Sequence, residues 1–466
     1  MDLQYLRKKY PKFIYERYSY GISKNNLEIL FSFKIPPDIE FKPKILIENI
    51  NKSNLERLGN ETLRNLIFNL GLIEMVSYWK ATCSPEVEIL AGSLCRKQIN
   101  WWKDLIIKGM GQFFYENKID FQKTDFLKII ASNKRSLTLS AKNKIAGLKN
   151  EYLVPVGGGK DSTVTMELLK KAAKNIQCFS LNPTKAALKI MEVAGCRKPI
   201  TAKREIDKKL LELNRKGYLN GHTPFSAYLA FLSLLAAAIS GQKYIALSNE
   251  RSSNEGNVKY LGKRINHQWS KSFEFENKFR DYSKEYLANN IEYFSFLRPL
   301  YEIQIAKIFS KYPQYFSSFL SCNEAYKTAS GTKKPTGKWC GNCSKCLFVY
   351  AILCPFLKER YLLKIFRKDV FKNKDLLLTM QQLIGERGFK PFECVGTKKE
   401  SLAALYLSLG KKEQLPFLLR HFKTKVLPKR KGLEKESKDI LTSWNERNNL
   451  SEEFIKILRK EISKKS

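Results

Sequence analysis

A run of three glycines at positions 157–159 constrains the fold of this chain more than any other feature. The glycines follow a short apolar stretch, residues 152–156, and they precede Lys160, Asp161 and Ser162. The apolar stretch is typical of a buried strand, and residues 163–173 carry apolar side chains at helical spacing. A strand, a glycine loop and a helix in this order form an anion site. Glycine lets backbone N–H groups approach a phosphate, and the helix N-terminus adds partial positive charge.

The loop is not a Walker A motif, because that motif requires Lys followed by Ser or Thr, and here Lys160 is followed by Asp161. It resembles the SGGxDS loop of PP-loop ATP pyrophosphatases, which cleave ATP to AMP and pyrophosphate while they adenylate a substrate. The match consists of Gly158, Gly159, Asp161 and Ser162, whereas Gly157 replaces the usual Ser and removes one hydroxyl donor. A glycine turn before an ordinary helix is the alternative interpretation.

Strand and helix patterns alternate after the loop. Strands are predicted at 176–181 and 244–247, and helices at 185–193, 207–213 and 225–239. This alternation predicts an α/β fold with a parallel sheet that binds ligands at the carboxyl ends of its strands. Ser180 lies at one such end, and Asn249, Glu250 and Arg251 follow another. We expect these residues near adenosine and near Mg-ATP or a second anion.

The pattern predicts four parts in the chain. Residues 1–150 form an N-terminal α+β domain, with a hairpin from strands at 13–20 and 27–35 and a helix at 61–80. The PP-loop ATP-binding domain, a Rossmann-like α/β unit, spans 151–320. A cysteine-rich module follows at 321–360, and a basic helical region at 361–466.

The cysteines indicate a metal site. Cys340, Cys343 and Cys346 lie three residues apart, and Cys322 lies eighteen residues before the first of them. Four thiolates suit a closed tetrahedral zinc site. An iron–sulfur cluster and uncoordinated thiols stay open, although Cys354 and Pro355 match a ferredoxin pattern only loosely. Ten cysteines used in this way favour a metal in a reducing compartment over disulfides.

Composition favours a cytoplasmic protein. The start of the chain lacks the apolar core of a signal peptide, and the longest apolar run, 225–239, is too short to span a bilayer. The net charge of +38 fits nucleic-acid binding, a polyanionic small substrate with ATP, or a lysine-rich compositional bias. No aromatic and basic RNA motif accompanies the charge, so we expect no specific nucleic-acid partner. The sequence predicts no oligomeric state.

Six strings taken together resemble one PP-loop family, from about residue 77 to about residue 404. They are PVGGGKDS, SNERSSNEGN, HQWSKSFEFE, FSFLRPLYEIQIAKIF, WCGNCSKCLFVY and PFECVGT. The family is the ATP-dependent epimerase of UDP-N-acetylmuramoyl-L-alanyl-L-glutamate, which inverts the terminal glutamate in peptidoglycan synthesis. The resemblance implies ATP and Mg²⁺ as cofactors, a small-molecule substrate, and an acyl adenylate that acidifies the α-carbon. PP-loop enzymes that make deazaguanine carry a similar cysteine group, which favours structural zinc.

The resemblance also implies roles for particular residues. Pyrophosphate binds at Gly157, Gly158, Gly159, Lys160, Asp161 and Ser162, with Asp161 near Mg²⁺. The pair that exchanges the α-proton is left unassigned among Cys394, Glu393, His267 and Lys80. Lys80 and Arg298 are expected to contact substrate. Two other classes stay open: a PP-loop enzyme that modifies tRNA, and a non-catalytic, zinc-braced nucleotide-binding protein.

Overall fold

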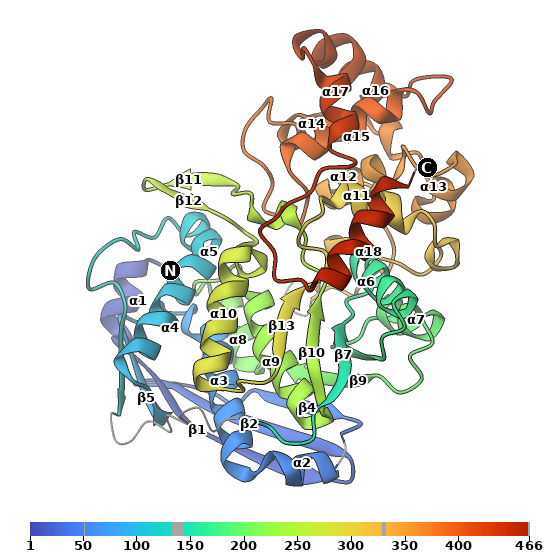
Figure 1. The fold of residues 1–466 in the computed structure, drawn as a ribbon. Helices are drawn as coiled ribbons and strands as arrows, with labels where there is room; N and C mark the ends of the chain where they lie inside the picture. Colours follow the sequence, from blue (N-terminus) through green and yellow to red (C-terminus); the bar gives the residue numbers. More distant parts are fainter. Residues whose placement is uncertain (51, 133–143, 329–331, 465–466) are drawn as a thin grey trace.

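The computed structural model describes residues 1–466 except 51, 133–143, 329–331 and 465–466. A twisted sheet with flanking helices forms the lower part of the molecule in Figure 1, and helices form the upper part. The main sheet has eleven strands among these residues, in the order β13-β10-β7-β8-β9-β4-β2-β1-β5-β6, with β3 paired to β2. The α/β class and the helical C-terminal region predicted from the sequence are confirmed.

The first half of the chain supplies the mixed side of the sheet. The predicted hairpin is present, because β1 (Lys12–Ser23) pairs antiparallel with β2 (Asn26–Ile35). The predicted helix is α3 (Asn60–Trp79), which is buried along most of its length. The other elements are α1 (Leu3–Lys9), β3 (Ile39–Phe41), β4 (Lys44–Glu48), α2 (Lys52–Leu58), β5 (Glu86–Ser93), α4 (Arg96–Gly109), α5 (Gly111–Glu116) and β6 (Lys128–Ser132).

Five parallel strands form the other side of the sheet, as the alternating pattern predicts. They are β7 (Lys149–Pro155), β8 (Ile176–Leu181), β9 (Ile200–Glu205), β10 (Gln242–Leu247) and β13 (Glu292–Ser295). The helices between them are α6 (Lys160–Lys171), α7 (Lys185–Val193), α8 (Lys208–Arg215), α9 (Phe225–Ser240) and α10 (Phe273–Tyr286). A separate two-stranded hairpin, β11 (Val258–Tyr260) and β12 (Lys263–Ile265), projects from this half.

The two sides of the sheet are joined edge to edge. Strand β4 pairs antiparallel with β9, from Lys44 opposite Glu205 to Glu48 opposite Thr201. A buried ion pair between Arg204 of β9 and Glu74 of α3 adds a side-chain link across the same junction. The boundary predicted near residue 150 falls just after the residues 133–143 that lie outside the description. The sheet is therefore continuous between the halves that the sequence pattern separates.

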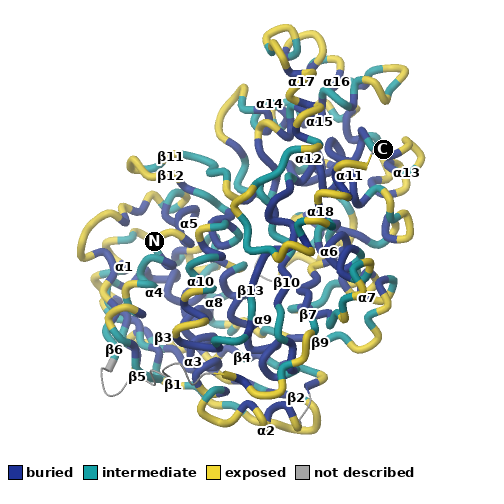
Figure 2. The backbone as a smooth tube through the Cα atoms, viewed as in Figure 1, coloured by how far each residue is buried: buried dark blue, intermediate teal, exposed yellow. Residues whose placement is uncertain are grey.

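The C-terminal helices share a core with the parallel strands. Val154 of β7 and Leu168 of α6 belong to the same buried cluster as Leu347 and Phe422, and this interior is dark blue in Figure 2. Lys171 of α6 pairs with Glu461 near the chain end. The helices of this region are α11 (Glu302–Phe309), α12 (Ser344–Leu353), α13 (Glu359–Phe366), α14 (Leu377–Leu383), α15 (Lys398–Leu409), α16 (Phe417–His421), α17 (Leu433–Asp439) and α18 (Glu452–Ser463).

Two further findings bear on the sequence predictions. Among the described residues no helix is long and apolar enough to cross a membrane. Cys178 of β8 and Cys196, just after α7, form a disulfide, whereas the other eight cysteines are free. This disulfide corrects the expectation that the cysteines serve a metal and form no disulfide. The βα unit brings the two Cα atoms to 6.2 Å, a proximity that their spacing of eighteen residues does not reveal.

Candidate active site

The glycine loop joins β7 to α6, as predicted, but the helix begins at Lys160 and not near residue 163. The hydroxyls of Ser162 and Thr163 donate to the Gly159 carbonyl at 3.2 and 3.1 Å, which satisfies a backbone oxygen at the start of the helix. Gly158 has φ +90°, and a Cβ there would lie 2.8 Å from the Ala187 backbone nitrogen of α7. Only glycine fits this close approach. The loop is thus shaped to expose backbone at the helix N-terminus.

Lys160 lies behind the loop in a buried ion-pair network. Its Nζ is 2.5 Å from Asp161 Oδ1 and 2.5 Å from Glu302 Oε2. Burial by itself lowers the pKa of Lys160, but the two carboxylates outweigh burial and raise it. Burial likewise raises the pKa of Glu302, but Lys160 and then Lys345 outweigh it and lower that pKa. Lys160 and Glu302 are therefore both charged, and Lys160 fixes Asp161 at the mouth of the loop.

The same network extends to the segment that contains Cys394. Lys345, in the first turn of α12, lies 3.8 Å from Glu302 and donates from Nζ to the Cys394 carbonyl. Its backbone N–H donates to Glu393 Oε2 at 3.0 Å. Cys394 is thus linked to the glycine loop through Lys345, Glu302 and Lys160. Two residues predicted as catalytic, Asp161 and Cys394, lie at the two ends of one chain of ion pairs and hydrogen bonds.

Lys271 approaches the Cys394 side chain from another element. Its Nζ lies 3.3 Å from Cys394 Sγ. Burial lowers the pKa of Lys271, but Cys394 and Glu250 outweigh burial and raise it. Glu250 is buried, and its pKa is raised to about 7, first by burial and then by the charge of Glu302. The predicted residue Glu250 therefore belongs to the same charged cluster.

His267 lies next to Cys394, with Nε2 4.0 Å from Sγ. Its Nδ1 is 2.5 Å from Gln112 Oε1, and its ring centre is 4.5 Å from that of His222. Burial, and then Lys271, lower the pKa of His267 to about 4, so the ring is neutral at physiological pH. The fold thus brings two of the predicted candidates, His267 and Cys394, side by side, and the chemical role of His267 stays a prediction.

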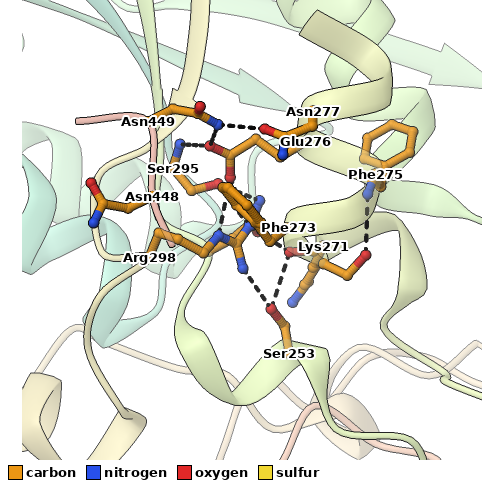
Figure 3. Close-up of polar contacts among 12 residues, drawn as sticks. Ser253, Lys271, Phe273, Phe275, Glu276, Asn277, Ser295, Arg298, Asn448 and Asn449 are labelled. Carbon is orange, nitrogen blue, oxygen red and sulfur yellow. Dashed lines mark hydrogen bonds and ion pairs between the residues drawn. The ribbon is translucent and has the colours of Figure 1, made fainter. Parts of the chain in front are cut away.

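Arg298 is fully buried and braces the loop after β10 (Figure 3). Its guanidinium pairs with Glu276 and donates to the Glu250 carbonyl and to the Ser253 hydroxyl. It also donates to the Lys271 carbonyl at 2.7 Å. These contacts lie within the protein, so they favour a positioning role. The predicted substrate contact of Arg298 gains no support from them.

The remaining predicted site residues, Ser180, Asn249, Arg251 and Lys80, each contact another group of the protein. Ser180 is buried and donates to the Val156 carbonyl next to the loop, at 2.8 Å. Asn249 donates to Ser295 at 3.2 Å, and the Arg251 guanidinium stacks 4.3 Å over the Tyr301 ring. Lys80, directly after α3, donates to the Gly221 carbonyl at 2.9 Å. Burial, and then Arg204, lower the Lys80 pKa to about 8.

The four predicted cysteine ligands do come together. The sulfur atoms of Cys322, Cys340, Cys343 and Cys346 lie within 4.8 Å of one another, with 3.8 Å between Cys322 and Cys343 and 3.6 Å between Cys340 and Cys346. Tetrahedral zinc with bonds of about 2.3 Å needs sulfurs about 3.8 Å apart, so the cluster fits zinc. Backbone N–H groups of Gly341 and Asn342 point at two of the sulfurs. The metal site predicted from the spacing is therefore assembled by the fold.

A basic cavity of about 680 Å³ opens beyond the carboxyl end of β8. Ala186 and Leu320 line it, and both contact Gly158 of the loop. No carboxylate is among the described lining residues, and the cationic ones are Lys185, Lys189, Lys338, Lys364 and Arg367. A cavity of this charge beside a glycine loop suits a phosphate-bearing ligand.

Sequence reasoning missed several members of the cluster. Glu302, Lys271 and Lys345 lie inside the strings RPLYEIQ, HQWSKS and CSKC, so the signal was present in the sequence. Their roles were hidden because lysines and glutamates occur throughout the chain. Gln112 and His222 carry no local signal, since only the fold places them beside His267.

Comparison with known proteins decides the family. Residues 4–296 match the family model of the MurL N-terminal domain, and residues 318–436 match that of the MurL C-terminal domain. The chain belongs to the MurL family. The N-terminal MurL region contains the glycine loop and His267, and the C-terminal region contains the cysteine cluster and Cys394, so both regions contribute to the candidate site.

Curated relatives share this assignment. The chain is 33% identical to the UDP-N-acetyl-alpha-D-muramoyl-L-alanyl-L-glutamate epimerase of Micromonospora sp., over 74% of this chain and 75% of that protein. It is 32% identical to the enzymes of the same name from Xanthomonas oryzae pv. oryzae, over 74% of both chains, and Salinispora tropica, over 74% of this chain and 73% of that one. No solved structure matches the chain. The epimerase family named from the sequence strings is therefore confirmed.

Proposed function

We propose that this protein inverts the terminal L-glutamate of UDP-N-acetyl-alpha-D-muramoyl-L-alanyl-L-glutamate, with consumption of ATP. The MurL relatives bear the name of this reaction. The observation that carries the proposal is the buried network from Lys160 through Glu302 and Lys345 to Cys394. This network supports the proposal because it links the glycine loop, proposed to bind phosphate, to Cys394, proposed to exchange a proton.

Activation of the carboxylate precedes proton transfer in this proposal. Removal of the α-proton next to a free carboxylate builds a second negative charge beside the first. Adenylation cancels the carboxylate charge and provides an electron sink at the carbonyl. AMP and pyrophosphate are then the products of ATP, and peptidoglycan synthesis receives the D-glutamyl dipeptide.

The Rossmann-like PP-loop half is proposed as the ATP site. Gly157, Gly158 and Gly159 offer backbone N–H groups, and Ser162 a hydroxyl, to pyrophosphate. Asp161 and Glu250 are the carboxylates that we propose would hold Mg²⁺, which would neutralise the charge of the leaving group. Ser180 suits the nucleoside end and the basic cavity beyond β8 suits phosphate groups, with Asn249 and Arg251 as further contacts. The cysteine cluster is proposed as a zinc brace.

Lys80 is the buried lysine best suited to attract a substrate anion. Lys160, Lys345 and Lys390 are at most 6% exposed, and Lys80 is 9% exposed. The first three are paired with carboxylates: Lys160 and Lys345 with Glu302, and Lys390 with Glu255 at 3.2 Å. Among the described residues Lys80 forms no ion pair, so we propose that its charge serves one of the substrate's phosphates or carboxylates.

The direct test is incubation with ATP, Mg²⁺ and the UDP-muramoyl dipeptide, followed by chiral analysis of the glutamate. We expect D-glutamate, AMP and pyrophosphate. The Asp161→Asn variant should lose both pyrophosphate release and exchange of the α-proton with deuterium oxide, because Asp161 acts before the proton is removed. ADP as the product, or exchange in wild type without ATP, would contradict the adenylate route.

A PP-loop enzyme that modifies tRNA is the second candidate, favoured only by the net charge of +38. The cationic surface and the ATP loop would serve it equally well. We propose a cytoplasmic location, where the UDP-linked precursor is made, and a small-molecule substrate without a specific nucleic-acid partner. Epimerisation of the dipeptide by the purified protein discriminates between the two candidates.

A further inference from the structure

We propose that Cys394 exchanges the α-proton on one face of the glutamyl residue, with Lys271 as its counter-ion and His267 as a hydrogen-bond acceptor held in place by Gln112. This inference rests on the proposed function and assigns the proton-transfer group within it. One of the four residues, Gln112, comes from a part of the chain outside the six family strings. The second face of the substrate is served by another acid.

The thiol lies between two nitrogen atoms of different character. Lys271 Nζ is 3.3 Å from Sγ, within hydrogen-bond distance for sulfur, and His267 Nε2 is 4.0 Å away. Cys394 itself is half-buried, so a substrate atom has access to it. An ammonium group at this distance stabilises a thiolate, which is the basic form of cysteine.

Gln112 determines which nitrogen of His267 carries the proton. The amide nitrogen of Gln112 donates to Glu116 at 2.7 Å, so its carbonyl oxygen faces the ring. An oxygen that can only accept requires Nδ1–H as the donor. Nε2 then carries the lone pair and faces Cys394. The imidazole can therefore accept a hydrogen bond from the protonated thiol, and burial keeps the ring neutral and that lone pair free.

The other candidates for this role are already engaged. Glu393 accepts the backbone N–H of Lys345 at the start of α12. Lys80 donates to Gly221. The charged and titratable groups around the thiol are Lys271, His267, Lys345, Glu393 and Lys390, with Glu250 beyond Lys271. Among these described residues only Cys394 combines access, a counter-ion and a hydrogen-bond acceptor for its proton.

The proton-transfer step balances without an added reagent. The thiolate takes the α-proton of the glutamyl adenylate, so the Cα–H bond breaks and an S–H bond forms. The electron pair of the C–H bond moves into the carbonyl and gives an enolate. An acid on the opposite face then donates a proton to Cα, and the enolate electron pair forms the new C–H bond. Cys394 then gives its proton to water and the second acid takes one from water, which returns both groups to their starting protonation states.

The first experiment uses Cys394→Ser, with Cys95→Ser as a matched control at a partly exposed cysteine remote from the site. With ATP, Mg²⁺ and the UDP-muramoyl dipeptide, Cys394→Ser should release pyrophosphate at a rate close to that of wild type. Deuterium incorporation at the α-carbon should fall by at least about 100-fold, the usual contribution of a positioned acid or base.

Undiminished deuterium incorporation would overturn the assignment. So would an enzyme-bound glutamyl thioester in intact mass spectra, because it would make Cys394 a nucleophile. Failure of wild type to release pyrophosphate would instead reject the proposed function.

The second experiment needs no substrate for its first readout and tests the counter-ion and the positioning residue. Iodoacetamide alkylation of the Cys394 peptide is followed against pH in wild type, Lys271→Met and Gln112→Met. Loss of the ammonium group should move the alkylation profile of Cys394 to higher pH, with the Cys95 peptide unchanged. Gln112→Met should lower kcat for epimerisation with little change in KM, because the ring can then present a protonated Nε2. Identical alkylation profiles for Cys394 in wild type and Lys271→Met would overturn the proposed counter-ion.

Discussion

The three loop glycines differ in how strictly the fold requires them. Gly158 has φ +90° and touches the backbone of α7, whereas a Cβ at Gly157 meets no atom within 4 Å and one at Gly159 meets only Ser321, at 3.6 Å. A sequence motif gives all three the same weight. In the structure only Gly158, the middle of the three, has a positive φ. Gly158 is therefore the position at which the backbone conformation requires glycine.

Gly158→Ala should therefore weaken both fold and function. Alanine at a positive φ costs about 1–3 kcal/mol, and the contact with Ala187 adds to this cost. We expect a lower Tm and loss of substrate-dependent pyrophosphate release. Gly157→Ala is the matched control and should leave Tm nearly unchanged. Equal Tm values for the two variants would show that the backbone of the loop relaxes around the added methyl group.

The paired histidines predict a pH effect on stability. The pKa of His267 is lowered to about 4 and that of His222 to about 3, in both cases first by burial. The unfolded chain takes up protons near the ordinary histidine pKa of about 6.5, and the folded chain does so only at lower pH. Stability present above pH 6.5 should thus be lost as the pH falls toward 4.

Urea unfolding from pH 7.5 to 4.5 measures this effect. Wild type should lose stability on acidification, and His222→Gln/His267→Gln should lose less over the same interval. His421→Gln, at the end of α16, is the control and should follow wild type. If the double variant also follows wild type, the loss of stability comes from other groups.

At the scale of elements, the Arg298–Glu276 pair holds α10, the loop after β10 and the C-terminal segment together (Figure 3). Glu276 Oε1 accepts from Asn449 at 2.9 Å and from the Ser295 backbone, while Arg298 reaches the loop. Figure 1 shows the segment before α18 passing close to α10. One ion pair thus fixes elements that are distant in sequence.

Arg298→Met should lower the free energy of unfolding by about 3–5 kcal/mol, because Glu276 is left as an unpaired buried charge. Urea denaturation measures the change. Arg298→Met/Glu276→Leu should recover part of the loss, since the second substitution removes the stranded carboxylate. The exposed pair Lys438–Glu434 gives the control, and Glu434→Gln should leave the free energy of unfolding nearly unchanged. A small effect of Arg298→Met would mean that water reaches Glu276.

The cysteine cluster predicts one zinc per chain. Elemental analysis of purified protein should find it, and Cys346→Ser should lose both the metal and several degrees of Tm, because four thiolates tie residue 322 to the start of α12. Cys95→Ser should keep the zinc. Stoichiometric iron, or full zinc content in Cys346→Ser, would contradict a four-cysteine zinc site.

At the scale of the whole molecule, the excess of basic residues is large, with 83 Lys and Arg against 45 Asp and Glu. We predict weak RNA binding without sequence preference, because such binding depends on phosphate contacts alone. Filter binding between about 50 and 200 mM salt should show a steep loss of affinity. A tight complex with one tRNA at physiological salt would promote the tRNA-modifying candidate.

Local sequence determined the secondary-structure elements and the position of the glycine loop between β7 and α6. The hairpin, helix α3, strand β8 and helix α7 follow from periodicity and turn residues, because these patterns act between near neighbours. The spacing of the four cysteines likewise predicts their cluster, because three of them are near neighbours in the sequence. The family strings also carry enough identity to name the epimerase family from the sequence alone.

Only the tertiary structure decided which residues work together. Lys160 contacts Glu302, Cys394 contacts Lys271, and His267 contacts Gln112. These pairs are 142, 123 and 155 residues apart in the sequence. The pairing of β4 with β9 and the ion pair between Arg298 and Glu276 also depend on tertiary structure. A charged side chain in water needs no specific partner. Once the fold buries it, an ion pair becomes necessary, because an unpaired buried charge is costly. That requirement arises from the packed fold, which is why the active-site network could not be read from the chain.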